Sequence, residues 1–129
     1  MRMNAMHNCK NPYQGDFKKA LCLCSAGLLR SPTLAYVLTN NGYNTRAAGV
    51  HDYALIEVDD VLVAWADTIF CVEPSIAETF EVMFPTNSKE IIVLNIPDNF
   101  EYRDPQLIQI IEKQLNEQNI PNIGHTFRP

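Results

Sequence analysis

The residues best suited to chemistry form one short segment that begins at Cys24 and ends at Ser31. It runs Cys-Ser-Ala-Gly-Leu-Leu-Arg-Ser, so five residues separate the cysteine from Arg30. A loop of this length can turn its backbone N–H groups toward one tetrahedral anion, and a helix that follows adds its positive N-terminal end. The spacing therefore predicts a phosphate-binding loop. The residues expected to bind the phosphate are Ser25, Ala26, Gly27, Leu28, Leu29 and Ser31.

The two ends of this loop suit nucleophilic catalysis. The positive field of the loop and helix favours the thiolate form of Cys24, which is the nucleophilic form, and Ser31 can donate a hydrogen bond to that sulfur. Arg30 offers a planar fork of donors that can span two equatorial phosphate oxygens. We therefore expect Cys24 to be the nucleophile and Arg30 the phosphate clamp.

A cysteine and an arginine also occur at this spacing by chance, as a buried thiol and a surface charge. The neighbouring segments favour the functional interpretation. Residues 19–23 form a short apolar run typical of a buried strand, and residues 34–38 place apolar side chains at helical spacing. This pattern predicts a strand that ends near Cys24 and a helix that starts near Arg30.

Strand and helix patterns continue to alternate along the chain. Further strands are expected at residues 45–48, 68–72 and 90–94. Helices are expected after Asp59-Asp60, with Val61, Leu62 and Trp65 on the inner side, after Pro74, and after Asp104-Pro105. Apolar strands that alternate with amphipathic helices indicate a parallel sheet covered on both faces. We predict an α/β fold, a three-layer αβα arrangement with a four-stranded parallel sheet, and the phosphate-binding loop after the first strand.

Composition limits the size of the protein, its partners and its location. The 129 residues, 47% of them apolar, suit one domain. Residues 1–17 are polar and irregular, which predicts an N-terminal extension, and residues 18–129 are expected to form the domain. The net charge of −5 and the scattered basic residues argue against nucleic acid as a partner. No apolar run has the roughly 18 residues that cross a bilayer, so a cytoplasmic protein without a membrane partner is expected, with a monomer favoured.

No cofactor or metal ion is expected. The four cysteines lack the paired spacing of zinc ligands, and His7, His51 and His125 are isolated from one another. We expect these histidines to be surface or terminal residues.

Residues 21–33 resemble the corresponding loop of the low-molecular-weight protein tyrosine phosphatases, which has the form cysteine-x5-arginine-serine-proline near the N-terminus. Ala47-Ala48-Gly49 and residues 65–69 are similar to two further segments of that family, and the likeness spans about residues 18–118. The chain looks like a compact, divergent member. The resemblance implies a protein tyrosine phosphatase that acts through a thiophosphate intermediate on a phosphorylated protein or a small phosphate monoester.

The resemblance also implies a general acid. Residues 96–100, Ile-Pro-Asp-Asn-Phe, are similar to a valine-proline-aspartate-proline-tyrosine stretch of the family. By this likeness Asp98 is the acid, and Phe100 takes the place of an aromatic residue that lines the substrate slot. Asp104-Pro105 keeps the aspartate-proline pair but stands where a helix N-cap is needed, so Asp104 is the second choice.

Two alternative functions stay open at this stage. A non-catalytic module that binds phosphate or a phosphoprotein would use the same loop without a correctly placed acid. An arsenate reductase on the same fold would need further cysteines in a mobile segment to resolve its adduct. Only Cys71 follows Cys24 in the sequence, and it falls in an expected strand.

Overall fold

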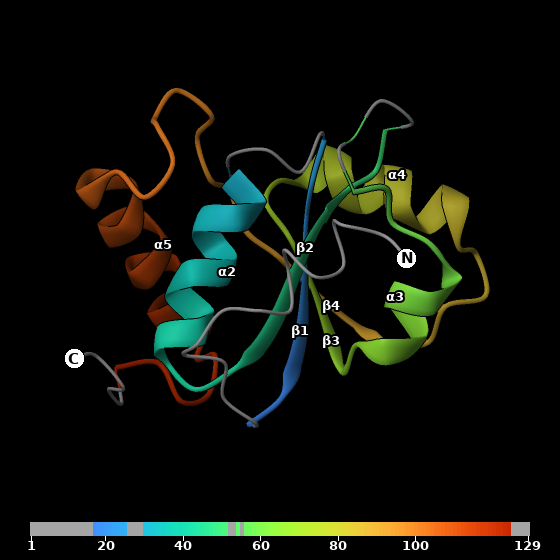
Figure 1. The fold of residues 1–129 in the computed structure, drawn as a ribbon, viewed down its shortest axis with the longest axis horizontal. Helices are drawn as coiled ribbons and strands as arrows, with labels where there is room; N and C mark the ends of the chain where they lie inside the picture. Colours follow the sequence, from blue (N-terminus) through green and yellow to red (C-terminus); the bar gives the residue numbers. More distant parts are fainter. Residues whose placement is uncertain (1–16, 26–29, 52–53, 55, 125–129) are drawn as a thin grey trace.

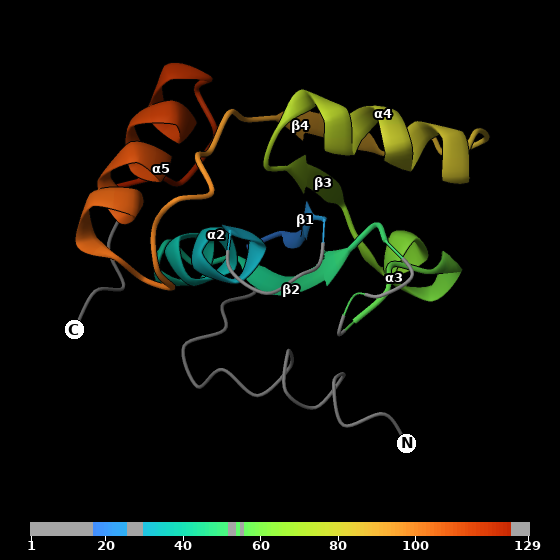
Figure 2. The ribbon, with the colours of Figure 1, turned by 90° about the horizontal axis from the view of Figure 1, so that it is seen from above.

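A computed structural model describes residues 17–25, 30–51, 54 and 56–124. In this part of the chain, four strands form one parallel sheet in the order β2-β1-β3-β4. The strands are β1 (Lys19–Cys24), β2 (Asn44–Gly49), β3 (Thr68–Cys71) and β4 (Glu90–Val93). The helices are α2 (Arg30–Asn40), α3 (Asp60–Trp65), α4 (Pro74–Met83) and α5 (Pro105–Glu117). Helices α2 and α5 cover one face of the sheet, and α3 and α4 cover the other (Figures 1 and 2), so the predicted three-layer fold is confirmed.

Strand β1 lies inside the sheet, between β2 and β3. Five of its six residues are buried, because it pairs with β2 on one side and β3 on the other and both of its faces are covered. Leu23 is paired with Cys71, and Cys24 with Gly49. The carboxyl ends of all four strands consequently lie at one edge of the sheet.

This edge contains a topological switch point. The chain leaves β1 toward α2 on one face and leaves β3 toward α4 on the other, although the two strands are neighbours. Open α/β sheets bind ligands in the crevice that such a divergence creates. The segment that follows Cys24 starts at this crevice.

Helix boundaries follow local capping chemistry. The side chain of Asp59 accepts a hydrogen bond of 2.9 Å from the backbone N–H of Leu62 at the start of α3. The side chain of Asp104 caps α5 in the same way. Glu73 stands at the N-cap of α4 but makes no capping hydrogen bond through its side chain, so its carboxylate can bind elsewhere.

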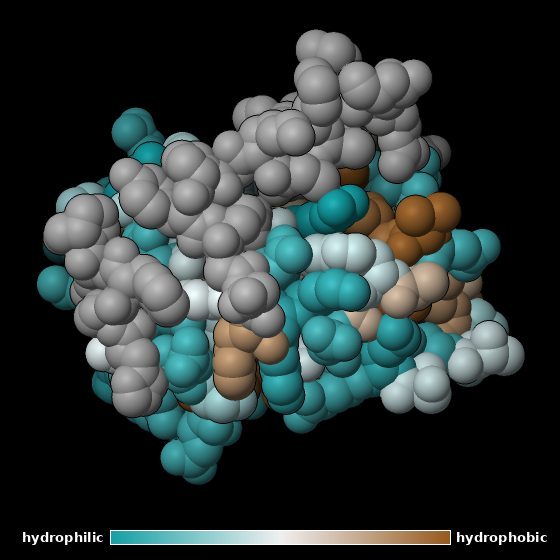
Figure 3. Space-filling model, turned by 60° about the horizontal axis from the view of Figure 1, so that its bottom comes forward, coloured by the Kyte–Doolittle hydropathy of each residue, from teal (hydrophilic) through white to brown (hydrophobic). Residues whose placement is uncertain are grey.

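One sequence expectation about α3 is wrong. Val61 is 68% exposed, whereas Leu62 and Ala66 are buried. These two buried residues are four apart and share one side of the helix, which rotates Val61 away from the core. Trp65 is half-buried, and the guanidinium of Arg46 stacks 4.6 Å from the centroid of its ring. Figure 3 shows hydrophobic side chains gathered on the side of the molecule where α3 and α4 lie.

Residues 1–16 lie outside the described residues, so the division into an extension over residues 1–17 and a domain over residues 18–129 stays a prediction. Strand β1 begins at Lys19. None of the helices in the described part of the chain has the length and apolar character needed to span a membrane.

Candidate active site

Cys24 and Ser31 meet at the carboxyl end of β1. Cys24 is the last residue of the strand and only 3% of it is exposed. Ser31, in the first turn of α2, is fully buried, and its Oγ lies 3.1 Å from the Cys24 Sγ. This distance allows a hydrogen bond between the hydroxyl and the sulfur. The structure therefore brings together the cysteine and the serine that were predicted to act as a pair.

Arg30 is the first residue of α2, and its side chain is held in place by two partners. Only 7% of the residue is exposed. Its Nη1 donates a hydrogen bond of 3.1 Å to the backbone carbonyl of Ile96 and lies 2.9 Å from the Glu73 Oε2. A guanidinium has five N–H donors, and those on Nε and Nη2 form a parallel pair that can bind two oxygens of an oxyanion.

The interior of the predicted phosphate loop falls outside the described residues. This applies to Ala26, Gly27, Leu28 and Leu29. The residues just before these four are described, and they form hydrogen bonds with the chain that follows β2. Val50 donates its backbone N–H to the Cys24 carbonyl at 3.0 Å, and His51 donates to the Ser25 carbonyl at 3.1 Å. The chain beyond β2 thus runs beside the start of the loop.

Asp98 and Phe100 lie on the segment that leaves β4. Asp98 is exposed and follows Ile96 by two residues, and the Ile96 carbonyl is the group that Arg30 binds. Phe100 is half-buried and packs against the core. Asp104, the second choice of acid, caps α5 by accepting a hydrogen bond of 2.8 Å from the Gln106 backbone N–H. The structural role expected for Asp104 is confirmed.

Two other cysteines near the site have environments that suppress ionisation. Cys22 is fully buried in β1, and burial, with smaller contributions from Cys24 and Cys71, raises its pKa well above the ordinary value. Burial, followed by the charge of Glu81, raises the pKa of Cys71 to about 12. Both side chains are therefore neutral thiols at neutral pH. Among the described residues, no three His, Cys, Asp or Glu side chains are grouped in a way that could hold a metal ion.

Three residues that contribute to this region were not predicted from the sequence. Glu73 comes two residues after β3 at the edge where Cys24 lies, and an acidic residue in that place was the available signal. His51 was expected at the surface, but it is half-buried beside Ser25. Thr33, two residues after Ser31, is buried and accepts a hydrogen bond from the backbone of Arg103, which no sequence pattern indicates.

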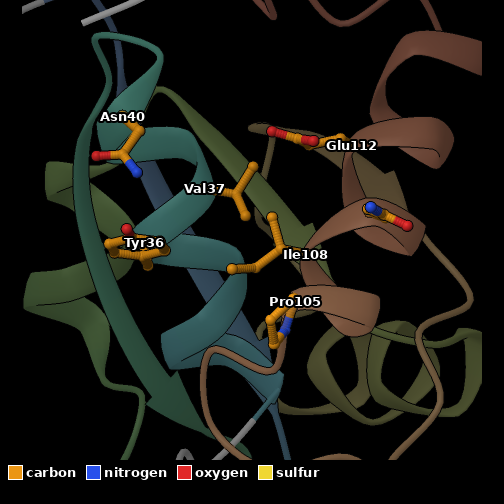
Figure 4. Close-up of a pocket in the computed structure, with 7 residues that line it drawn as sticks. Tyr36, Val37, Asn40, Pro105, Ile108 and Glu112 are labelled. Carbon is orange, nitrogen blue, oxygen red and sulfur yellow. The ribbon is translucent and has the colours of Figure 1, made fainter. Parts of the chain in front are cut away.

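The structure also contains a cavity of about 400 Å³ between α2 and α5 (Figure 4). In the close-up, Tyr36 and Val37 come from α2, and Pro105 and Ile108 come from α5. None of the residues that line this cavity belongs to the predicted phosphate site.

Several solved structures share this architecture. The tyrosine phosphatase Wzb from Escherichia coli K30, solved with phosphate, has a TM-score of 0.64 at 17% identity, over 79% of this chain and 96% of its own. SP-PTP, a low-molecular-weight protein tyrosine phosphatase from Streptococcus pyogenes, has a TM-score of 0.65 at 12% identity, over 79% of this chain and 91% of its own. The chain has the fold of the low-molecular-weight protein tyrosine phosphatases. The resemblance found in the sequence is thereby confirmed at the level of the fold.

The same fold also occurs in a protein of a different stated specificity. The YwlE arginine phosphatase from Geobacillus stearothermophilus has a TM-score of 0.62 at 15% identity, over 87% of this chain and 99% of its own. No family model and no curated protein sequence matches the chain. In this low-molecular-weight phosphatase fold, the pairing of Cys24 with Ser31 lies at the end of β1 and the start of α2.

Proposed function

We propose that this protein is a cysteine-dependent phosphate monoester hydrolase. The observation that carries the proposal is the placement of three side chains at the switch point of the sheet. The Cys24 sulfur lies 3.1 Å from the Ser31 hydroxyl, and the buried guanidinium of Arg30 begins the helix that follows. A nucleophile, a donor to its sulfur and a planar cation are the groups that phosphate transfer to a thiol requires.

In the first step, the Cys24 thiolate attacks the phosphorus atom and forms a P–S bond. The bond between phosphorus and the leaving oxygen breaks, and Asp98, in its acid form, gives its proton to that oxygen. The Nε and Nη2 donors of Arg30 bind two equatorial oxygens and stabilise their charge in the transition state. The products are the free alcohol or phenol and a thiophosphate on Cys24.

In the second step, the Asp98 carboxylate takes a proton from water while the water oxygen attacks phosphorus. The P–S bond breaks, and inorganic phosphate and the Cys24 thiolate are released. A hydrogen bond from Ser31 to the sulfur stabilises its negative charge, which makes the thiolate a better leaving group. No cofactor takes part in either step.

The proposed substrate class is aryl phosphate, with phosphotyrosine in a protein as the natural form. Phe100 lies two residues after Asp98 and packs against the core. An aromatic side chain held in this way gives an apolar wall against which a flat ring can stack. Phosphoarginine is the second candidate, because a protein with the same fold is an arginine phosphatase.

The test is release of inorganic phosphate from p-nitrophenyl phosphate and from peptides that carry phosphotyrosine, phosphoserine or phosphoarginine. We expect turnover of the aryl substrates, with phosphotyrosine preferred among the peptides. Cys24→Ser should abolish turnover but keep the fold and the affinity for phosphate, because a hydroxyl does not ionise as a thiol does. Phosphate binding without turnover in the wild-type protein would identify a non-catalytic binding module instead. Turnover that survives in Cys24→Ser would exclude the proposed nucleophile.

A further inference from the structure

Both ends of the segment that carries Asp98, residues 97–102, are attached to the N-terminal half of α2. Just before the segment, the carbonyl of Ile96 accepts a hydrogen bond of 3.1 Å from Arg30. Just after it, the backbone N–H of Arg103 donates a hydrogen bond of 3.1 Å to the Thr33 Oγ1. Arg30 and Thr33 are three residues apart and therefore lie on the same side of the helix. The helix that begins with the phosphate clamp thus holds both ends of this segment.

The attachment at Arg103 involves the side chain as well as the backbone. Its φ of 62° lies in the left-handed region, which is unfavourable for a residue with a Cβ atom. The guanidinium stacks 3.8 Å from the centroid of the Tyr36 ring, and Tyr102 lies further away at 5.8 Å. A residue keeps such a backbone conformation only when its surroundings enforce it. The hydrogen bond to Thr33 and the stack on Tyr36 supply that enforcement.

The attachment at Arg103 also lies next to the first turn of α5. Tyr36, on which Arg103 stacks, and Pro105, the first residue of α5, both line the cavity between α2 and α5 (Figure 4). Asp104, between Arg103 and Pro105, is fixed by its capping bond to Gln106. The carboxyl end of residues 97–102 is therefore fixed by α2 on one side and by the start of α5 on the other.

We propose that Thr33 and Arg103 are positioning residues for the general acid: they hold residues 97–102 so that Asp98 reaches the leaving oxygen. The inference rests on the proposed function and adds to it the elements that place the acid. A general acid acts only within hydrogen-bond reach of its oxygen, and a displacement of about 1 Å can remove much of its contribution. Neither Thr33 nor Arg103 touches the substrate in this mechanism.

The experiment compares Thr33→Val, which removes the acceptor but keeps the shape, with Thr33→Ser, which keeps the hydroxyl. Turnover is measured on phenyl phosphate, whose leaving group needs a proton, and on 2,4-dinitrophenyl phosphate, whose leaving group does not. We expect Thr33→Val to lower kcat/KM on phenyl phosphate about fivefold or more, the factor that corresponds to one net hydrogen bond, and to leave kcat/KM on the dinitrophenyl substrate nearly unchanged. The comparison uses kcat/KM because it reports the first step, whereas kcat also includes hydrolysis of the thiophosphate, which is the same for both substrates. Thr33→Ser should recover the rate on phenyl phosphate.

Two further variants separate positioning from a general loss of structure. In the Asp98→Asn background, Thr33→Val should cost nothing more on phenyl phosphate, because the acid is already gone. Arg103→Gly keeps the left-handed backbone and its N–H but removes the stack on Tyr36, so it should show the same substrate dependence as Thr33→Val in a milder form. It also carries the test if Thr33→Val does not fold.

The outcomes distinguish this inference from the proposed function. Equal losses on both substrates, or no loss on either, in Thr33→Val and Arg103→Gly would overturn the positioning role while the wild-type turnover upheld the hydrolase. Absence of turnover on both substrates in the wild-type protein would overturn the proposed function itself, and the positioning role with it.

Discussion

The Nη1 of Arg30 lies 2.9 Å from the Glu73 carboxylate, and this contact joins the start of α2 to the end of β3 across the switch point of the sheet. About a third of the Glu73 side chain is exposed, whereas the Arg30 side chain is nearly buried. The carboxylate binds the nitrogen that also donates to the Ile96 carbonyl, so one edge of the guanidinium is fully engaged by the protein. The opposite edge carries Nε and Nη2, the pair of donors that the proposed mechanism assigns to the phosphate oxygens.

The first prediction concerns this ion pair. Glu73→Ala should lower kcat/KM on an aryl phosphate about tenfold, because the guanidinium loses one of the two partners that fix its orientation. Glu73→Gln keeps an acceptor oxygen and should cost less, about threefold. Steady-state kinetics of purified variants measure both effects.

Glu78→Gln is the matched control for Glu73→Gln, because Glu78 lies on the same helix, α4, and is exposed. Its rate should equal that of the wild type. Wild-type rates in Glu73→Ala as well would show that the ion pair does not orient the clamp.

The second prediction uses the difference between the buried thiols and the proposed nucleophile. Iodoacetamide at neutral pH should label Cys24 in the folded protein and leave Cys22 and Cys71 unlabelled. The raised pKa of Cys22, and the pKa of about 12 for Cys71, mean that both carry their protons until the solution is strongly alkaline, and only a thiolate reacts. Peptide mapping by mass spectrometry, in a Cys9→Ser background, identifies the labelled residue.

The labelling experiment has two controls. Inorganic phosphate should protect Cys24, because the proposed mechanism has the phosphate group bind against this sulfur. Unfolding in urea should expose all three thiols to the reagent, since burial is the main cause of both raised pKa values. Labelling of Cys22 or Cys71 ahead of Cys24 in the folded state would contradict the assignment of the nucleophile.

How far the sequence predicts this structure depends on the range of the interaction. The strands and helices follow from local patterns of apolar residues. The caps at Asp59 and Asp104 could also be predicted from the sequence, because each capping residue directly precedes its helix. The parallel sheet follows from apolar strands alternating with amphipathic helices. The short helix α3 has too few turns for its buried side to be predicted from the spacing of apolar residues. Val61 was therefore wrongly expected on the inner side, and Leu62 faces the core.

The contacts that complete the site could not be predicted in this way. Glu73, which contacts Arg30, lies 43 positions after it in the sequence, and Arg103 lies 70 positions after Thr33. Such contacts depend on the course of the loops at the carboxyl edge of the sheet. Apolar periodicity fixes the strands and helices but carries no information about which polar side chains those loops bring together.

The third prediction concerns stability at high pH. Tyr43 is buried, and burial, with a smaller contribution from the charge of Glu90, raises its pKa from 10 to about 12. The unfolded chain ionises Tyr43 near pH 10 and the folded chain only near pH 12, so the free energy of unfolding should fall as the pH rises between these values. The loss due to Tyr43 should be about 2 kcal/mol. Urea unfolding across this range measures it.

Tyr43→Phe should reduce this pH dependence. The variant also loses the hydrogen bond of 2.6 Å that the Tyr43 hydroxyl donates to the Pro121 carbonyl, so it should be less stable by about 1 kcal/mol at neutral pH. Tyr102→Phe is the matched control, since Tyr102 is 50% exposed and should leave the pH dependence unchanged. Equal slopes in wild type and Tyr43→Phe would show that Tyr43 is not the group that titrates.

The fourth prediction decides which aspartate is the general acid. Asp98→Asn should lower kcat/KM, which reports the first step, about a hundredfold on phenyl phosphate and far less on 2,4-dinitrophenyl phosphate, because only the poorer leaving group needs a proton in that transition state. Asp98 is exposed and lies two residues beyond the carbonyl that Arg30 binds, on the segment that leaves the carboxyl edge of the sheet. Asp104 already serves as the N-cap of α5, and asparagine caps a helix nearly as well, so Asp104→Asn should cost little on either substrate. If the dependence on the leaving group appears in Asp104→Asn and not in Asp98→Asn, Asp104 is the acid. The roles of Cys24 and Arg30 would survive that result, because neither depends on which carboxyl group supplies the proton.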